Sequence, residues 1–300
     1  MARGLVLRDL IPSAPVIRAA ISLLRFTPVT LARALAAGGG TLAWAAQRDR
    51  RRILLENLSY TAADRTPAER RRMARRTFRN LAVTAVDQFR LPSMSPTELR
   101  SLFEIRGLEH VDAAQARGKG TVVATAHLGP YELAAACLSA QGYTVYGMVE
   151  ELQPALRDAL ASYRSATGMQ LVNMKDGLRA AYRILGDGHI LALVADRAIG
   201  GARSAIEAPF AGGRRLLPTG PAVFAQATGA ALITAFAWPN PAGEPRYVME
   251  FDPPLIAESR DAAERERLMT IVVERMSNAV RRNPDQWFVF QPNWIASDIA

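Results

Sequence analysis

From residue 103 onward, the sequence alternates between short apolar runs rich in β-branched residues and longer segments with helical character. Such runs, bounded by Gly and Pro, predict buried strands. We expect strands at residues 103–106, 121–126, 143–149, 170–173, 190–195, 232–236 and 247–251. We expect helices at residues 131–140, 154–167, 177–185, 218–227 and 262–282. This alternation predicts an α/β fold with a mostly parallel central sheet and helices on both faces.

Two helix starts precede this region. Thr66-Pro-Ala-Glu69 and Ser95-Pro-Thr-Glu98 both match a capping box with proline at the first helical position. The first predicts a helix over residues 67–89, and the second predicts a short helix that ends near Phe103. A break is expected at Gly38-Gly-Gly40.

The N-terminal residues 5–46 are apolar but contain four arginines, so no uninterrupted stretch has the length of about 20 residues that a membrane-spanning helix needs. Arg18, Arg25 and Arg33 fall near one stripe of a helix, which is typical of a helix lying in a membrane interface. An ordinary amphipathic helix packed on the domain is the equal alternative. We therefore divide the chain into an N-terminal amphipathic helical segment, 1–47, and a single α/β domain, 48–300.

The net charge is +9, and +7 of it lies between Arg48 and Arg79, where eleven arginines face four acidic residues. A local basic surface of this kind favours an acidic partner such as anionic lipid, a phosphate-bearing substrate or nucleic acid. One interpretation is therefore a non-catalytic basic protein that binds nucleic acid or an anionic membrane.

The stretch Thr121-Val-Val-Ala-Thr-Ala-His127-Leu-Gly-Pro-Tyr-Glu132 favours an enzyme instead. It predicts a buried strand that delivers His127 to its carboxyl end, a turn on Gly129-Pro130 and a helix that carries Glu132. Ligands of open α/β sheets bind beyond the carboxyl ends of the strands, so His127 is placed where chemistry occurs. The sequence lacks Cys/His metal-ligand spacing, a phosphate-binding P-loop and a Gly-x-Ser-x-Gly elbow, so no metal or cofactor is expected.

These motifs give the chain a family resemblance over roughly residues 50 to 295. His127-x4-Glu132 follows the segment 103–112, and a later block contains Ala195-Asp-Arg197, Glu207 to Gly212 and Pro218-Thr-Gly-Pro221. The chain resembles the bacterial glycolipid acyltransferases, which include the lipid A secondary acyltransferases and the phosphatidylinositol mannoside acyltransferase. It departs from them at Pro130-Tyr131, where Asn-Trp is usual.

The resemblance implies acyl transfer from acyl-CoA or acyl-ACP to a hydroxyl of a glycolipid, most like phosphatidylinositol mannoside acylation. Lipid A acylation is the alternative within this class. His127 is suited to act as the general base, and no acyl-enzyme is required. The implied partners are the acyl donor, the glycolipid and an anionic membrane surface, without nucleic acid. The implied location is the cytoplasmic face of the cell membrane, as a peripheral or monotopic protein.

A base of this kind needs a carboxylate to hold its tautomer. Glu132 is near in sequence, whereas Glu207 matches the acid that pairs with the histidine in the mannoside acyltransferase, so Glu207 is slightly favoured and Glu132 is left to order the turn or bind the acceptor. Asp196 is expected to be structural or helix-capping.

The remaining candidates are substrate-binding groups. Arg197 follows a strand end, and Arg214 and Arg215 are expected on a loop; their guanidinium groups suit the diphosphate of coenzyme A or a lipid phosphate. The backbone amide of Gly129 or Leu128 is a candidate for stabilising an oxyanion.

Overall fold

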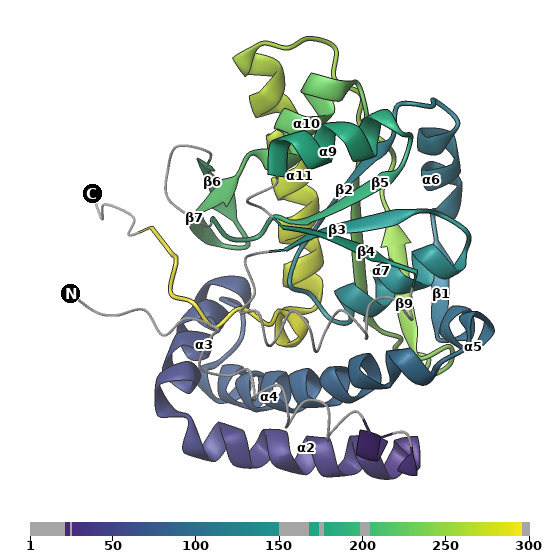
Figure 1. Ribbon diagram of the computed structural model, residues 1–300. Coiled ribbons are helices and arrows are strands. Elements are labelled where there is room, and N and C mark those ends of the chain that lie inside the picture. The colour runs from purple at the N-terminus through teal and green to yellow at the C-terminus, as the bar shows by residue number, and fades with distance from the viewer. Residues whose placement is uncertain (1–21, 25, 150–167, 174–176, 199–204, 296–300) are drawn as a thin grey trace, which may run out of the picture.

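The computed structural model describes residues 22–24, 26–149, 168–173, 177–198 and 205–295 (Figure 1). Within these ranges, the chain forms a seven-stranded sheet with the order β1-β9-β8-β2-β5-β3-β4. Its strands are β1 (Phe103–Arg106), β2 (Thr121–Thr125), β3 (Val145–Val149), β4 (Gln170–Asn173), β5 (Ile190–Val194), β8 (Ala231–Pro239) and β9 (Tyr247–Phe251).

The sheet is mostly parallel, which confirms the prediction. Strands β8, β2, β5, β3 and β4 run in one direction, while β9 runs antiparallel to β8 and parallel to β1. Strand β2 lies in the middle of the sheet beside β5, and Thr121 pairs with Ile190 while Thr125 pairs with Val194. Because the two strands end at the same level, the residues that follow them meet at one edge of the sheet.

Helices pack on both faces of the sheet. Those on one face are α9 (Gly177–Gly186), α10 (Gly220–Thr228) and α11 (Ala262–Arg282), and those on the other are α5 (Pro96–Ser101), α6 (Leu108–Gln115) and α7 (Tyr131–Ala140). Successive residues of β2 point to opposite faces, so Val122 belongs to one buried cluster and Val123 to the other. This two-sided burial explains why β2 is a continuous apolar run.

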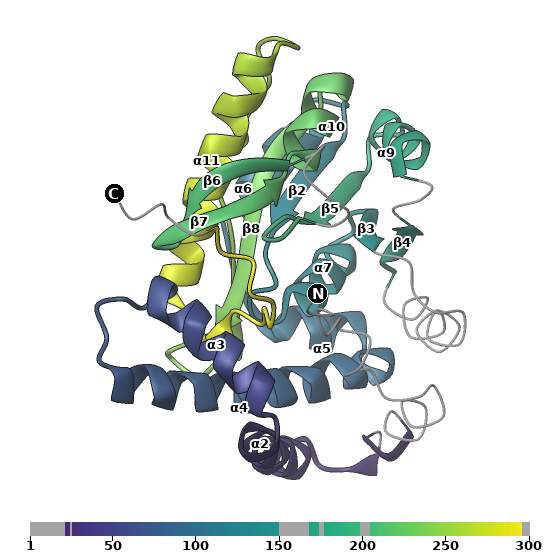
Figure 2. The ribbon, with the colours of Figure 1, turned by 90° about the vertical axis from the view of Figure 1, so that its left-hand side faces the viewer.

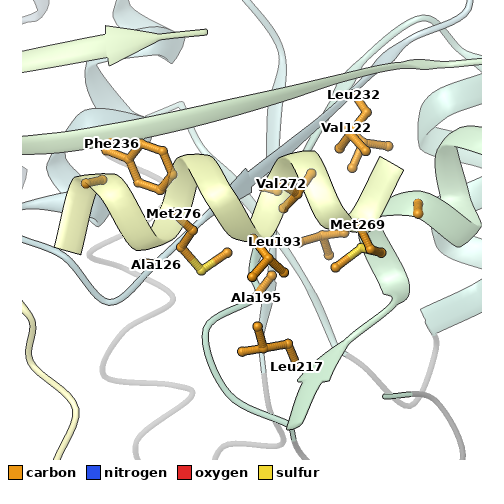
Figure 3. Packing of buried hydrophobic residues seen from close by; sticks show 14 of the residues in the cluster. Val122, Ala126, Leu193, Ala195, Leu217, Leu232, Phe236, Met269, Val272 and Met276 are labelled. Carbon is orange, nitrogen blue, oxygen red and sulfur yellow. The ribbon is translucent and has the colours of Figure 1, made fainter. Parts of the chain in front are cut away.

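Helix α11 covers the middle of the first face. Figure 3 shows its side chains Met269, Val272 and Met276 lying against strand residues that include Leu193 and Leu232. All three of these α11 side chains are fully buried. Burying one such side chain stabilises a fold by about 1.5–3 kcal/mol, so this contact fixes the sheet that carries the two central strands.

A second, two-stranded antiparallel sheet follows β5 in the sequence. It consists of β6 (Ala205–Phe210) and β7 (Gly213–Pro218), joined at Ala211-Gly212, where φ is 44° and 100°. Arg214 and Arg215 were expected on a loop, which is wrong because both lie on β7. Proline and paired glycines conceal the pattern, but Ala208, Phe210 and Leu217 are buried while their neighbours face outward.

The basic N-terminal half forms α2 (Val29–Ala46), α3 (Arg48–Thr61), α4 (Pro67–Arg90) and a 3-10 turn, η2 (Leu91–Ser93). Figures 1 and 2 show α2 and α4 side by side. Both predicted capping boxes are confirmed, at Thr66 and Ser95. The predicted break at residues 38–40 is wrong, because α2 continues through them. A Cβ on Gly40 would lie 2.6 Å from the carbonyl oxygen of Phe78 in α4. The glycine lets α2 approach α4 closely instead of ending the helix.

Asp87 of α4 joins α2 to the sheet. Its side chain is fully buried, and its carboxylate accepts hydrogen bonds from Arg33 Nε and Arg246 Nε, both at 2.7 Å, and from the hydroxyl of Tyr247. Arg33 therefore faces the body of the protein.

Arg18, Arg25 and the helix expected at 154–167 lie outside the described residues, and the division into 1–47 and 48–300 stays a prediction. No helix in the part of the chain that the structure describes is long and apolar enough to cross a bilayer.

Candidate active site

His127 lies in the turn between β2 and α7. The turn depends on Gly129, whose φ is 54°, because a Cβ at this position would lie 2.3 Å from the carbonyl oxygen of Ala237. Only glycine adopts this conformation at such close approach without strain. The His127 side chain is 16% exposed, so it is held by its surroundings but still accessible at the carboxyl edge of the sheet.

The residue that pairs with His127 is Asp196, two residues after the end of β5. Asp196 Oδ1 lies 2.7 Å from His127 Nδ1, and Asp196 Oδ2 accepts the backbone N–H of His127 at 2.9 Å. An ionised carboxylate only accepts hydrogen bonds, so Nδ1 carries the proton and Nε2 presents its lone pair. This is the tautomer that a general base requires.

Asp196 is held in its ionised form. Its side chain is 0% exposed, and burial by itself would raise its pKa. The charge of His127 and the hydrogen bonds from His127 and Trp287 outweigh burial and lower the pKa of Asp196 to about 2. A carboxylate in this state stabilises a positive charge on the neighbouring imidazole.

Residues near the end of the described chain complete the site. After the 3-10 turn η5 (Pro284–Gln286), the indole Nε1 of Trp287 donates to Asp196 Oδ2 at 2.8 Å. The amide of Phe288 donates to the carbonyl oxygen of His127, and the amide of Gly129 donates to that of Gln286, both at 2.8 Å. This segment therefore fixes both the acid and the turn that carries the base.

The expected pairing of Glu207 with His127 is wrong. Glu207 lies on the outward face of β6, 45% exposed, and accepts a hydrogen bond from Arg214 Nε at 2.6 Å. Strand geometry explains this, because its neighbour Ala208 points into the core and successive side chains alternate. Glu132 does not take the place of Glu207: its carboxylate accepts a hydrogen bond from Gln88 of α4. The catalytic role expected of Glu207 depended on that pairing and is not supported by its position, whereas a contribution of Glu132 to catalysis stays a prediction.

The three arginine candidates have different surroundings. Arg197 follows Asp196 and is partly buried, and Arg214 is 48% exposed, so their proposed phosphate contacts stay predictions. Arg215 is 0% exposed and lies on β7, not on a loop. Its guanidinium presents no surface to a phosphate, so the structure contradicts the expected role of Arg215.

The backbone amides of the turn are already engaged. Leu128 N–H donates to the carbonyl oxygen of Ala126 at 2.7 Å, and Gly129 N–H donates to Gln286. The expectation that one of these amides stabilises an oxyanion therefore does not match the structure. Gly129 instead acts by permitting the turn.

Sequence reasoning missed two residues of the site, Asp196 and Trp287. Asp196 carried a usable signal, since it directly follows a predicted strand, but its distance from His127 depends on β5 being the neighbour of β2. Trp287 stands 91 residues after Asp196, and only the aromatic character of its segment marked it. Among the residues that the structure describes, no group of three or more His, Cys, Asp or Glu side chains is placed to hold a metal ion.

Comparisons with known proteins match most of the chain. A family model described as bacterial lipid A biosynthesis acyltransferase matches residues 12–295. The chain is 30% identical over 215 residues to the phosphatidylinositol mannoside acyltransferase of Mycobacterium tuberculosis (strain CDC 1551 / Oshkosh), which covers 69% of this chain and 66% of the relative. It is 29% identical over 216 residues to the protein of the same name from Mycolicibacterium smegmatis (strain ATCC 700084 / mc(2)155), covering 70% and 68%. The chain therefore spans about two thirds of the length of the curated relatives that it matches.

Proposed function

We propose that this chain, which belongs to the family of bacterial lipid A biosynthesis acyltransferases, transfers a fatty acyl group from acyl-CoA to a hydroxyl of a glycolipid. The observation that carries the mechanism is the contact of 2.7 Å between His127 Nδ1 and the buried Asp196. It leaves Nε2 free to take a proton from the acceptor hydroxyl.

The reaction needs one base and no covalent enzyme intermediate. Nε2 of His127 takes the hydroxyl proton while the acceptor oxygen attacks the thioester carbonyl carbon. The C–S bond then breaks, and the imidazolium returns the proton to the departing thiolate, so the products are the acylated lipid and free thiol. Asp196 stabilises the transient imidazolium, and general-base assistance of this kind contributes about 10²- to 10⁴-fold in rate.

The proposed acceptor is a phosphatidylinositol mannoside. It is supported by the two mycobacterial relatives, whose names specify this substrate. Lipid A acylation is the second candidate, because the matching family is named for it. Acyl-ACP is the alternative donor to acyl-CoA.

We also propose that α2 lies on the cytoplasmic face of the membrane, as in a peripheral or monotopic protein. Its leucines face outward: Leu31, Leu35 and Leu42 are 50%, 65% and 72% exposed. Arg33 points inward to Asp87, so the apolar stripe is the free side of α2. The neighbouring helices α3 and α4 carry ten of the eleven clustered arginines, and each well-placed arginine adds about 1 kcal/mol of attraction to anionic lipid.

The catalytic proposal is tested with purified protein, mixed acyl-CoAs and candidate glycolipids, and mass spectrometry of the lipid products. We expect an acylated mannoside with wild-type protein and a loss of at least about 100-fold with His127→Ala. His189→Ala is the matched control, because His189 stacks on Tyr146 at the opposite end of the sheet.

Product from lipid A precursors alone would replace the proposed acceptor, and turnover only with acyl-ACP would replace the donor. Full turnover by His127→Ala would contradict the mechanism. A protein that acylates no lipid but binds DNA with strongly salt-dependent affinity would instead support the non-catalytic interpretation.

Flotation with anionic vesicles tests the membrane proposal. Leu35→Glu combined with Leu42→Glu should reduce vesicle binding at least about tenfold, because each substitution places a charge on the apolar stripe. Leu216→Glu is the control, since Leu216 is an exposed leucine on β7. Equal binding by all variants would contradict the proposed orientation.

A further inference from the structure

We propose that Arg215 and Trp287 are positioning residues that hold the ionised Asp196 and thereby tune His127 as a base. This inference rests on the proposed function, because it concerns the same dyad. Among the residues that the structure describes, neither side chain forms a hydrogen bond with His127, so their effect passes through Asp196.

The Arg215 guanidinium is held by aromatic rings. Its Cζ lies 5.1 Å from the ring centroid of Trp287 and 4.7 Å from that of Trp294. The side chain is 0% exposed, and none of its three nitrogens has a hydrogen-bond partner. A desolvated cation is attracted by the negative face of an indole ring, so the two tryptophans stabilise the guanidinium in place of hydrogen-bond partners. The C-terminal segment keeps this arrangement, since Trp294 forms a bridge with Arg215 and stacks on Tyr60.

Trp287 links this cation to the dyad. One face of its indole meets Arg215, and its Nε1–H donates to Asp196 Oδ2 at 2.8 Å. A cation on the ring face withdraws electron density and makes the indole N–H a stronger donor, in the way that neighbouring polar contacts reinforce one another at low dielectric. Arg215 thus strengthens one of the hydrogen bonds that keep Asp196 ionised.

Arg215 also acts through its charge. Burial lowers its pKa to about 10, the negative charge of Asp196 opposes this change, and the positive charge of Arg197 adds to it. The ring of Tyr131 also lies beside His127, with centroids 5.5 Å apart. Arg215 is buried and forms no hydrogen bond with Asp196, so replacing Arg215 removes a positive charge but leaves every hydrogen bond of Asp196 in place.

Both residues have the same predicted effect on the titration of His127. Arg215→Met removes a positive charge near the dyad, which favours the imidazolium. Trp287→Phe removes a donor to Asp196, so more of the carboxylate charge acts on the Nδ1–H. Each substitution should raise the midpoint pH of the His127 ring by about 0.5 unit or more.

The measurement is NMR of protein labelled at histidine Cε1, titrated with pH. The chain has only three histidines, His110, His127 and His189, and His127→Ala assigns the resonance of interest. Unchanged signals from the other two show that a variant is folded. Arg214→Met is the matched control on the same strand, because Arg214 is exposed and pairs with Glu207.

An upward shift in Arg215→Met and Trp287→Phe, absent in Arg214→Met, supports the proposal. Midpoints equal to or below that of the wild type overturn it. If Arg215→Met does not fold, the Trp287→Phe titration decides alone. The titration needs no substrate, so its result is independent of the acceptor and donor. In the acyl-transfer assay, the same variants should lose kcat without a matching change in KM, and their pH profiles should shift in the same direction.

Discussion

Replacing Asp196 with asparagine tests the central geometric claim. Asparagine has the same shape, and its amide oxygen can still accept from the indole of Trp287 and the backbone N–H of His127. The NH₂ group then takes the place of Oδ1, which lies 2.7 Å from Nδ1. Because an amide NH₂ donates, Nδ1 must accept, and the proton moves to Nε2. In that tautomer His127 cannot take a proton from the acceptor.

The loss follows from this change of tautomer. General-base assistance contributes about 10²- to 10⁴-fold, and the corresponding Asp→Asn change in serine protease triads lowers kcat by about 10⁴. We therefore expect Asp196→Asn to lower kcat by about 10³- to 10⁴-fold. At about 1.36 kcal/mol for each factor of ten, this is about 4–5 kcal/mol of transition-state stabilisation. KM should change little, since Asp196 is 0% exposed and does not reach a substrate.

The assay measures the rate of thiol release from acyl-CoA in the presence of the glycolipid acceptor, with saturating concentrations of both. Asp187→Asn is the matched control, because Asp187 is an exposed aspartate just before the opposite end of β5. Far-UV circular dichroism should show that both variants are folded. A kcat for folded Asp196→Asn within about threefold of the wild type would refute the assignment of Asp196 as the partner of His127.

Four further predictions follow from particular contacts. Glu207→Gln should change kcat by less than about threefold in the same assay, because its pair with Arg214 is exposed. Asp87→Asn should lower the free energy of unfolding, measured with urea, by about 3 kcal/mol, because it leaves partly buried arginines without a counter-charge. Gly129→Ala should cost about 1–3 kcal/mol in the same measurement, since its φ is 54° and its Cβ would meet a carbonyl oxygen. The pKa of Asp196 is lowered from 3.8 to about 2, so the ionised form stabilises the fold above pH 3.8 and this stability is lost as the pH falls through 2. Urea titrations between these pH values should therefore show the wild type losing about 2 kcal/mol relative to Asp196→Asn.

The sheet was predictable because its signal is local. Buried parallel strands appear as continuous apolar runs, and β2 and β5 begin where they were expected. The capping boxes at Thr66 and Ser95 were predictable for the same reason, since each depends on residues three positions apart. His127 was located because it directly follows a strand.

The acid was not predictable because its identity depends on strand order. His127 and Asp196 meet since β5 is the neighbour of β2, and β5 follows β2 only after β3 and β4 in the sequence. A match in sequence to Glu207 could not show that β6 turns this side chain outward. Gly40 failed as a helix-breaking signal for a related reason, because its role is set by the proximity of α4.

The segment at residues 286–288 has a consequence for how this chain matures. Strands β2, β5 and β8, which form the middle of the sheet, are all complete by residue 239. The indole of Trp287 and the backbone groups of Gln286 and Phe288, which hold Asp196 and the turn that carries His127, come almost fifty residues later, after α11. During synthesis, the scaffold and the pair of His127 and Asp196 can therefore assemble before the contacts of residues 286–288 exist, and the support that these contacts give to the site is acquired last.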